Sequence, residues 1–476
     1  MTWQRALSVP GLLLIGWAAT ASATGWLPRS PDRTTPPPPL SMLPSVTAAD
    51  RLLIVAPHED DETLGAGGLI QQAVAAGAAV RVVYLTYGDH NELGFLLYKK
   101  RPSLTPAEHA RMGELRRREA IHAMARLGVP ADHLVFLGYP DGDTLDMWKR
   151  AWGETPPWRS RATRTSFVPY ADAASYGHPH KGEAILQDLE RELLTFRPTH
   201  VAVTQPVDGH PDHRACYLYL EVALLNVAGR LPTPQLLTYP IHIGTWPHPY
   251  GFRPQIWLPV PTPLTDGGFR WWMVPLTKAQ VTRKQEAIRD YRSQLVGAQG
   301  WMTAFARRNE LFAEIPPLTV PHEHWGPPAA LLARPESPDY ASGASATSHL
   351  TGVAYGQSAD GFQVRLALER PLEEELGVSL YLFGYRHDCP FASMPKLHIE
   401  SSLGRWRVSN QHVRVDAAII HVDLRPREAV ITVPWSLLEF PEIVLVQAQG
   451  VVGGMPMTQT SWRTLLIAPE LTTGAS

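Results

Sequence analysis

Residues 51–62 read RLLIVAPHEDDE, and this stretch decides the fold of the N-terminal domain. The apolar run Leu52–Ala56 has the length and composition of a strand buried on both faces, and His58 with four acidic residues follows it. The chain repeats this arrangement where HPDH, residues 210–213, follows the apolar run His200–Val203. Open α/β sheets bind ligands at the carboxyl ends of strands, so we expect the chemistry at these two points.

Strand-like and helix-like segments alternate around these two clusters. Further buried strands are expected at Val80–Thr86, Leu134–Gly138 and His200–Thr204. Helices are expected from Thr105 to Leu127, from Gly182 to Phe196, from Asp212 to Val227 and from Thr277 to Leu295. The first helix carries a capping box at Thr105 and Glu108 and a stop at Gly128. This order predicts an α/β domain with a mostly parallel sheet and helices on both faces.

Length and composition exclude some classes of partner. A chain of 476 residues exceeds the usual size of one domain, so two domains are expected. The net charge of -2 gives no broad basic surface, and no nucleic-acid partner is expected. Cys216 and Cys389 fall in different expected domains, which favours two packed thiols, with a bridge between them as the minor alternative.

The first residues carry the pattern of a secretory signal peptide. Arg5 precedes the apolar stretch Ala6–Ala21, and a small-residue site ends at Ala23. We expect a signal peptide at residues 1–23 and a secreted or periplasmic protein without a stable membrane span after cleavage. An uncleaved membrane anchor is the alternative. A proline-rich linker is expected at residues 24–48, and the first domain at residues 49–315.

The pattern changes after residue 315. Residues 316–348 are rich in proline, alanine and serine and are expected to be a linker. Beyond them, residues 349–470 alternate apolar and polar side chains, which predicts strands with one buried face. The expected strands contain Phe362–Leu368, Val378–Leu382, Ile420–Leu424, Ala429–Val433 and Ile443–Ala448. The pattern predicts a β-sandwich-like domain that either contacts glycans or packs against the first domain.

The spacing inside the two clusters indicates a metal site. If a helix begins near Asp60, His58 and Asp61 can converge on one point, whereas the Asp60 side chain points elsewhere. His213 would complete a set of two imidazoles and one carboxylate, with positions left open for water and substrate. A divalent metal lowers the pKa of bound water to about 7 and needs an adjacent base, so the pattern favours metal-dependent hydrolysis.

Two motifs, PHEDDE at residues 57–62 and HPDH at residues 210–213, make the chain resemble the PIG-L/LmbE-like metal-dependent N-deacetylases. Further matches are Arg116 with Glu119, LGV at residues 127–129, FLGYPDG at residues 136–142 and YRSQ at residues 291–294. The resemblance covers about Ala49 to Phe312 and implies a Rossmann-like domain.

The resemblance implies a metal, a base and a substrate class. One divalent metal, zinc or ferrous iron, would be held by His58, Asp61 and His213. Asp60 would act as the general base. The substrate would be an N-acetylated sugar or glycoconjugate.

The resemblance also implies roles for residues around the metal. His210 would stabilise the oxyanion or protonate the departing amine, and Asp212 would orient His210 by a hydrogen bond. Arg116 and Asp141 match positions that contact the sugar in some members.

Two positions depart from the family pattern. Glu59 stands where the family usually has proline, which adds a carboxylate near the metal. Asp208 stands where some members place a tyrosine that helps to polarise the amide, so a tyrosine-based oxyanion contact has no support here. Within residues 142–180, Trp148, Trp152 and Trp158 either anchor a loop to the core or stack on sugar rings.

Together these observations predict an exported, metal-dependent hydrolase that uses water to remove an N-acyl group, most simply acetyl, from an amino sugar or glycoconjugate. One alternative is a sugar-binding protein that uses the deacetylase scaffold and the β-domain without catalysis. Another is an exported scaffold whose main activity lies in the second domain. The intact set of His58, Asp60, Asp61 and His213 favours the enzyme.

Overall fold

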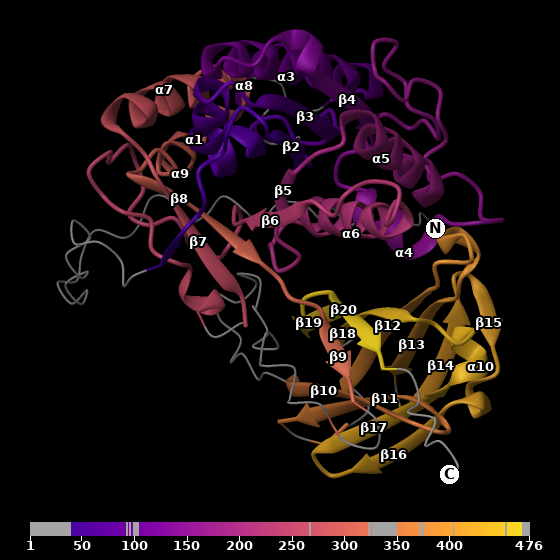
Figure 1. Cartoon of the computed structure of the whole chain (residues 1–476). Coiled ribbons are helices and arrows are strands. Elements are labelled where there is room, and N and C mark those ends of the chain that lie inside the picture. Colours follow the sequence, from indigo (N-terminus) through magenta and orange to yellow (C-terminus); the bar gives the residue numbers. More distant parts are fainter. Residues whose placement is uncertain are drawn as a thin grey trace, which may run out of the picture.

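The computed structural model describes residues 40–91, 94, 97, 98, 104–265, 268–321, 325, 350–369, 371, 372, 376–402, 404–452 and 455–468. They form an α/β domain, above, and a β-sandwich, below (Figure 1). The expected signal peptide, residues 1–23, lies outside the described residues, as does most of each expected linker. No helix of the described residues is long and apolar enough to cross a bilayer.

One eight-stranded sheet forms the centre of the α/β domain. Its strands are β1 (Ser41–Met42), β2 (Arg51–Ala56), β3 (Ala79–Thr86), β4 (Leu134–Tyr139), β5 (His200–Thr204), β6 (Gln235–Tyr239), β7 (Arg270–Pro275) and β8 (Asn309–Glu314). The strand order is β1-β7-β8-β6-β5-β2-β3-β4. Strands β2 to β6 pair in parallel, whereas β8 is antiparallel to both β6 and β7. The predicted mostly parallel sheet is therefore confirmed.

The strand order reverses at β2, which places the two clusters together. From β2 the chain builds β3 and β4 on one side, and it later adds β5 and β6 on the other side. Such a reversal opens a crevice at the carboxyl ends of the two central strands. His58 follows β2 and residues 210–213 follow β5, so both clusters lie at this crevice.

Helices cover both faces of the sheet (Figure 1). They are α1 (Asp61–Ala75), α3 (Pro106–Leu127), α4 (Thr144–Arg150), α5 (Gly182–Phe196), α6 (Pro211–Asn226), α7 (Lys278–Ile288), α8 (Arg292–Leu295) and α9 (Gln299–Thr303), with 3-10 turns η1 (Ala131–His133) and η2 (Thr262–Leu264). Helices α1, α3 and α7 contact one another, and α6 contacts both α4 and α5. The predicted capping box at Thr105 and Glu108 is confirmed, and Gly128 ends α3 at φ 93°.

The helix expected from Thr277 to Leu295 is wrong as a single element. The structure has α7 and α8 instead, with a break between Ile288 and Arg292. Tyr291 leaves the helical region at φ -81° and ψ 58°, and its hydroxyl donates a hydrogen bond to the buried Glu62. This tertiary hydrogen bond accompanies a backbone turn that the local pattern does not reveal.

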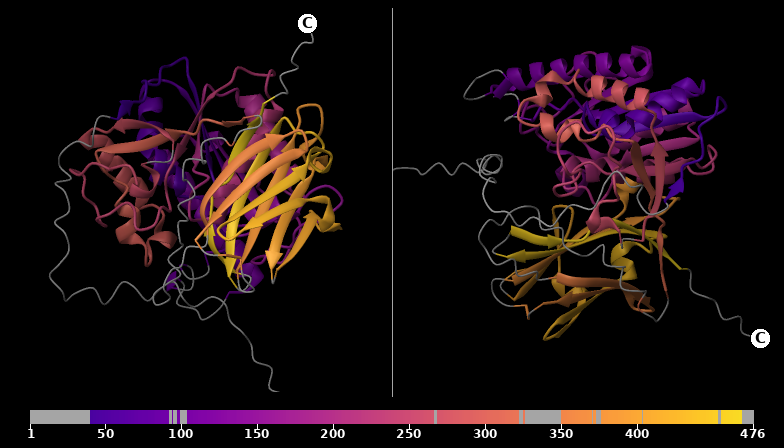
Figure 2. Two further views of the ribbon diagram at one scale, coloured as in Figure 1. Left: turned by 90° about the horizontal axis from the view of Figure 1, so that it is seen from below. Right: turned by 90° about the vertical axis from the view of Figure 1, so that its left-hand side faces the viewer.

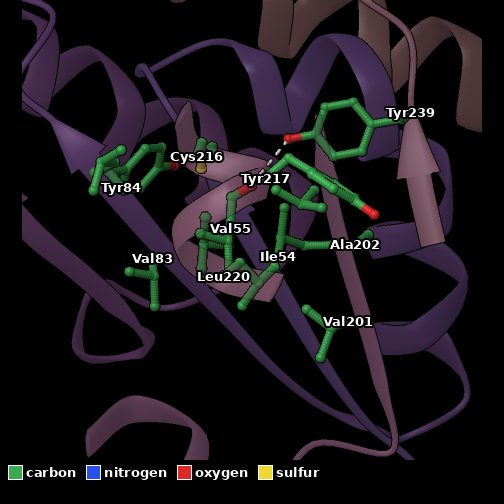
Figure 3. Packing of buried hydrophobic residues seen from close by; sticks show 14 of the residues in the cluster. Ile54, Val55, Val83, Tyr84, Val201, Ala202, Cys216, Tyr217, Leu220 and Tyr239 are labelled. Atoms are coloured by element: carbon green, nitrogen blue, oxygen red, sulfur yellow. Dashed lines mark hydrogen bonds between the residues drawn. The ribbon is translucent and has the colours of Figure 1, made fainter. Parts of the chain in front are cut away.

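The core behind the crevice joins the central strands to α6. Figure 3 shows Val55 of β2 and Tyr84 of β3 close to Cys216 of α6. The hydroxyl of Tyr239, at the end of β6, donates to the carbonyl oxygen of Val55 at 3.4 Å. Cys216 and Cys389 are both free thiols, so the alternative of a bridge is wrong.

The C-terminal domain is a sandwich of two mostly antiparallel sheets. Sheet β10-β11-β17-β16 consists of β10 (Leu350–Ser358), β11 (Gly361–Leu368), β16 (His421–Arg425) and β17 (Glu428–Pro434). The larger sheet consists of β9 (Leu318–Val320), β12 (Leu376–Tyr385), β13 (Lys396–Ser402), β14 (Arg405–Asn410), β15 (Val413–Val415), β18 (Ile443–Val452), β19 (Met455–Gln459) and β20 (Arg463–Ile467). Short turns η3 (Phe391–Ser393), η4 (Ala417–Ile419) and α10 (Trp435–Leu438) complete it. The predicted sandwich-like domain is confirmed, and β9 lies inside the segment expected to be a linker.

The sandwich packs against the α/β domain through aromatic side chains that we call the aromatic seam. It comprises Trp148, Trp152, Phe383, Phe391 and Trp462. The ring centroids of Trp148 and Phe391 are 5.5 Å apart, and those of Trp148 and Phe383 are 5.6 Å apart. The two views of Figure 2 show the sandwich lying against one side of the α/β domain. Of the two alternatives for the second domain, packing against the first is thus confirmed.

Two expectations change at the seam. Strand β12 is buried on both faces, because Leu380 and Leu382 face the sandwich interior while Tyr381 and Phe383 face the α/β domain. The prediction of one buried face is therefore wrong for this strand. Trp148 and Trp152 are fully buried in the seam, so they anchor their segment and do not stack on sugar rings.

Candidate active site

Three side chains from distant parts of the chain converge at the crevice. Nδ1 of His58 lies 3.2 Å from Oδ2 of Asp61. Nε2 of His213 lies 3.2 Å from the same carboxylate oxygen and 3.3 Å from Nδ1 of His58. We call these three residues the metal cluster. His58 leaves the end of β2, Asp61 begins α1 and His213 lies in the first turn of α6.

The dimensions of the metal cluster fit a tetrahedral metal ion. Ligand distances of about 2.0 to 2.1 Å place neighbouring corners of a tetrahedron about 3.3 to 3.4 Å apart. The three observed edges of 3.2, 3.2 and 3.3 Å lie close to this value. Two imidazoles and one carboxylate suit zinc or ferrous iron and leave a further position for ligands from solution.

Carboxylates lie next to the outer nitrogen of each imidazole of the metal cluster. Nε2 of His58 lies 3.1 Å from Asp141 and 3.2 Å from Asp212. Nδ1 of His213 lies 3.2 Å from Asp208. Such pairs fix the ring orientation of metal-binding histidines and increase their basicity, so the surroundings also match a metal site.

Charge around the cluster favours a cation. Burial opposes protonation of His213, but the carboxylates of Asp208 and Asp61 outweigh it and raise the pKa of His213 to about 9. Burial acts likewise on His58, yet Asp141 and other nearby carboxylates hold its pKa well above the ordinary value. Carboxylates that stabilise positive charge on the two imidazoles also stabilise a divalent metal bound between them. An imidazole binds a metal in its neutral form, so protons are released as the metal binds.

Asp60 is held beside the cluster in a strained conformation. It directly precedes α1 at φ 150° and ψ -28°, a region that residues other than glycine rarely adopt, and its side chain makes no capping hydrogen bond. Nη2 of Arg116 lies 3.4 Å from Oδ2 of Asp60 and donates at 3.1 Å to the carbonyl oxygen of Glu59. Burial raises the pKa of Asp60 to about 7, against the opposing charge of Arg116. A carboxylate in this setting suits proton transfer near neutral pH.

Much of the N-terminal half of the chain matches a known protein family. The family described as "PIG-L: GlcNAc-PI de-N-acetylase" matches residues 53–224, which include the whole metal cluster. Residues 53–224 are a PIG-L family domain.

Relatives of this PIG-L domain include two enzymes named 1D-myo-inositol 2-acetamido-2-deoxy-alpha-D-glucopyranoside deacetylase. The protein of Mycobacterium sp. (strain KMS) is 38% identical over 186 residues, which are 38% of this chain and 52% of the relative. The protein of Kineococcus radiotolerans is 34% identical over 202 residues, 41% of this chain and 51% of the relative. The chain spans about half the length of the curated relatives it matches.

Solved structures give weaker similarities. A conserved protein from Thermus thermophilus is 24% identical with a TM-score of 0.34, over 58% of this chain and 99% of that protein. N,N'-diacetylchitobiose deacetylase from Pyrococcus horikoshii is 19% identical with a TM-score of 0.34, over 56% of this chain and 84% of that protein.

The PIG-L domain brings His210 and Asp212 to the cluster, with a different hydrogen bond from the one expected. The ring centroids of His210 and His58 are 4.7 Å apart. The backbone N–H of Asp212 donates to Nδ1 of His210 at 3.3 Å. The carboxylate of Asp212 accepts instead from Gly142 and Thr144, in addition to its contact with His58. Gly142 has φ 77°, and a Cβ there would lie 2.4 Å from His90.

The two residues expected to contact sugar have protein partners in the PIG-L domain. Arg116 is 3% exposed, and Nη1 donates to the carbonyl oxygen of Gly88 at 3.1 Å. Asp141 accepts from the backbone N–H of His90 at 2.8 Å. Their contact with substrate stays a prediction. Glu59, in place of the usual proline, is fully buried with Oε2 3.6 Å from Nε of Arg116.

His242, which lies beyond the PIG-L domain, also reaches the site, although none of the sequence motifs includes it. A ligand nitrogen of His242 lies within 4.8 Å of ligand atoms of Asp61 and His213. His242 follows β6 by three residues, so it leaves the same edge of the sheet as the two clusters. The short strand-like run LLTYPI at residues 236–241, followed by a histidine, was the signal that could have identified it.

Proposed function

We propose that the protein is an exported metal-dependent hydrolase that removes an N-acyl group, most simply acetyl, from an amino sugar or glycoconjugate. The observation that carries this proposal is the metal cluster, three ligand atoms 3.2 to 3.3 Å apart with Asp60 next to Asp61 in sequence. The names of the curated relatives specify a 2-acetamido sugar, which supports an acetylated amino sugar as substrate. The signal-like sequence at residues 1–23 supports export.

His58, Asp61 and His213 would hold the metal, zinc or ferrous iron. When bound, such a metal supplies Lewis acidity that polarises the acyl carbonyl and makes water a stronger nucleophile near neutral pH. Asp141, Asp212 and Asp208 keep the two imidazoles oriented for this task. Arg116 holds Asp60 at the start of α1, where its carboxylate can take a proton.

The reaction proposed for these residues is hydrolysis of an amide. The oxygen of water bonds to the acyl carbon while one proton of the water passes to the Asp60 carboxylate. The C–N bond then breaks, its electron pair stays on nitrogen, and the nitrogen takes up a proton to leave as the amine. Acetic acid, which loses its remaining proton to solvent as acetate, and the free amino sugar are the products. His210 is suited to hydrogen-bond the acyl oxygen or to supply the proton to nitrogen, because its ring lies beside the metal cluster, with its centroid 4.7 Å from that of His58 and the two rings nearly perpendicular.

Amine release from N-acetylglucosamine oligomers and a panel of N-acetylated sugars tests this proposal. Asp60→Ala is expected to lower turnover by about 10² to 10⁴-fold, because a general base is removed. Chelation is expected to abolish release and added zinc to restore it. Asp360→Ala, in the exposed turn between β10 and β11, is the matched control. Equal release by wild type and Asp60→Ala contradicts the role of Asp60, and release that survives chelation contradicts the metal.

Export is tested by fractionation of expressing cells and by sequencing the N-terminus of the recovered protein. The expected mature chain begins at Thr24 and is found outside the cytoplasm. An intact N-terminus in the membrane fraction would support the uncleaved anchor instead.

A further inference from the structure

His242 brings a further imidazole to the metal cluster from a separate loop. Its ring centroid lies 4.8 Å from that of His213 and 5.5 Å from that of His210. A ligand nitrogen lies within 4.8 Å of ligand atoms of Asp61 and His213. The three ligand atoms of the metal cluster lie closer to one another than this, at 3.2 to 3.3 Å.

Contacts on several sides hold the His242 loop in place. The backbone N–H of His242 donates to Oδ2 of Asp208 at 2.9 Å, and its carbonyl oxygen accepts from the N–H of Gly209 at 2.8 Å. The imidazole stacks on Trp301, with centroids 4.9 Å apart and an interplanar angle of 13°. Nε1 of Trp301 donates in turn to the carbonyl oxygen of Trp246 at 3.3 Å. The side chain is therefore oriented by the fold itself.

Asp208 explains how this loop reaches the metal cluster. Oδ1 of Asp208 accepts from the backbone N–H of His210 at 2.8 Å, and Oδ2 accepts from His242 and lies 3.2 Å from Nδ1 of His213. One buried carboxylate thus ties three histidines together. As an anion, Asp208 cannot donate a hydrogen bond to a developing oxyanion. The imidazole of His242, whose backbone Asp208 holds, can donate one.

We propose that His242 is a further catalytic residue, whose imidazole N–H donates a hydrogen bond to the acyl oxygen as that oxygen gains negative charge. This inference rests on the proposed deacylation. Hydrolytic metal sites keep a position open beside three protein ligands, and a fixed donor next to that position stabilises the transition state more than the bound substrate. Asp208 and Trp301 are the positioning residues for His242.

The test compares His242→Ala and His242→Gln with wild type in the full chain loaded with zinc. We expect kcat to fall by about 10² to 10³-fold in His242→Ala with little change in KM, as for loss of an oxyanion donor. Because its amide N–H can donate, His242→Gln is expected to recover part of this loss. His248→Ala, an exposed histidine on the same loop, is the control.

Two binding measurements separate the possible outcomes. Zinc affinity is expected to be the same in wild type and His242→Ala, whereas acetate, the product anion, is expected to bind more weakly to the zinc-loaded variant. A tenfold or larger loss of zinc affinity would make His242 a ligand and overturn the proposal. Unchanged kcat and unchanged acetate affinity would also overturn it. If wild type hydrolyses no N-acetylated sugar but the variant still binds acetate more weakly, the proposed function fails and His242 remains an anion-binding residue.

Discussion

The metal cluster and the aromatic seam are both buried, but they are built from opposite kinds of side chain. The cluster assembles carboxylates and imidazoles whose desolvation opposes folding unless a cation and hydrogen bonds compensate. The seam assembles large aromatic rings, whose burial stabilises the folded state directly. From this difference we expect the seam to supply stability and the metal cluster to supply the proposed chemistry.

One short helix joins the two regions. At the start of α4, the backbone N–H of Thr144 donates to the Asp212 carboxylate at 3.1 Å, and its hydroxyl donates to the same oxygen. One turn later, Trp148 of the same helix packs against Phe383 and Phe391 of the sandwich. Because Asp212 also contacts His58, the sandwich is linked to the metal cluster through α4.

Removing one imidazole of the metal cluster should abolish hydrolysis while leaving the aromatic seam intact. We expect His213→Ala to lose bound zinc and to lower kcat/KM by roughly 10⁴-fold, which corresponds to about 5.4 kcal/mol in the barrier. Metal analysis and amine release measure the two effects. His412→Ala, an exposed histidine in the sandwich, is the control. Full zinc content and activity in His213→Ala would show that the cluster is not the metal site.

Truncating the seam should have the opposite result. We expect Trp148→Ala to lower the free energy of unfolding by about 3 to 5 kcal/mol, because it leaves a cavity among buried rings. Urea unfolding followed by far-ultraviolet circular dichroism measures the change, and Trp148→Phe should lose less. An unchanged midpoint would mean that the two domains do not stabilise each other through this residue.

Thr144 lies where the two regions meet, and its substitution should affect both to a smaller extent. We expect Thr144→Val to lower the free energy of unfolding by about 1 to 3 kcal/mol, because it leaves one oxygen of the buried Asp212 without a hydroxyl donor. Activity should fall as well, since Asp212 orients His58. Urea unfolding and amine release are the measurements. Thr144→Ser keeps the donor and should behave like wild type, and a similar loss in both variants would argue against the hydrogen bond.

A surface substitution gives the lower limit of the comparison. Val413 is 59% exposed in β15 and lies in neither region. We expect Val413→Ser to change the free energy of unfolding by less than about 0.5 kcal/mol and to leave amine release unchanged. A larger loss of stability would indicate that this face of the sandwich is covered in solution.

Local patterns were sufficient for much of the fold and of the metal cluster. The run Leu52–Ala56 and the capping box at Thr105 are decided by neighbouring residues, and the structure has both. His58 and Asp61 are close in sequence, and HPDH indicates the start of a second helix after a strand. The convergence of these side chains at one edge of the sheet could therefore be expected. His242 was not predicted as a site residue, because its contact with the metal cluster depends on Asp208 in a different loop.

The sequence by itself determined the parallel sheet, the sandwich and the convergence of His58, Asp61 and His213, because strand periodicity, helix caps and motif spacing act over a few residues. Only the tertiary structure decided that β12 is buried on both faces, that Tyr291 interrupts a helix and that His242 joins the site. Each of these depends on side chains that meet across large sequence separations. Such contacts form only after the sheets and helices have packed. A local pattern, such as the run before His242, can suggest a candidate residue, but it does not fix the partners of that residue.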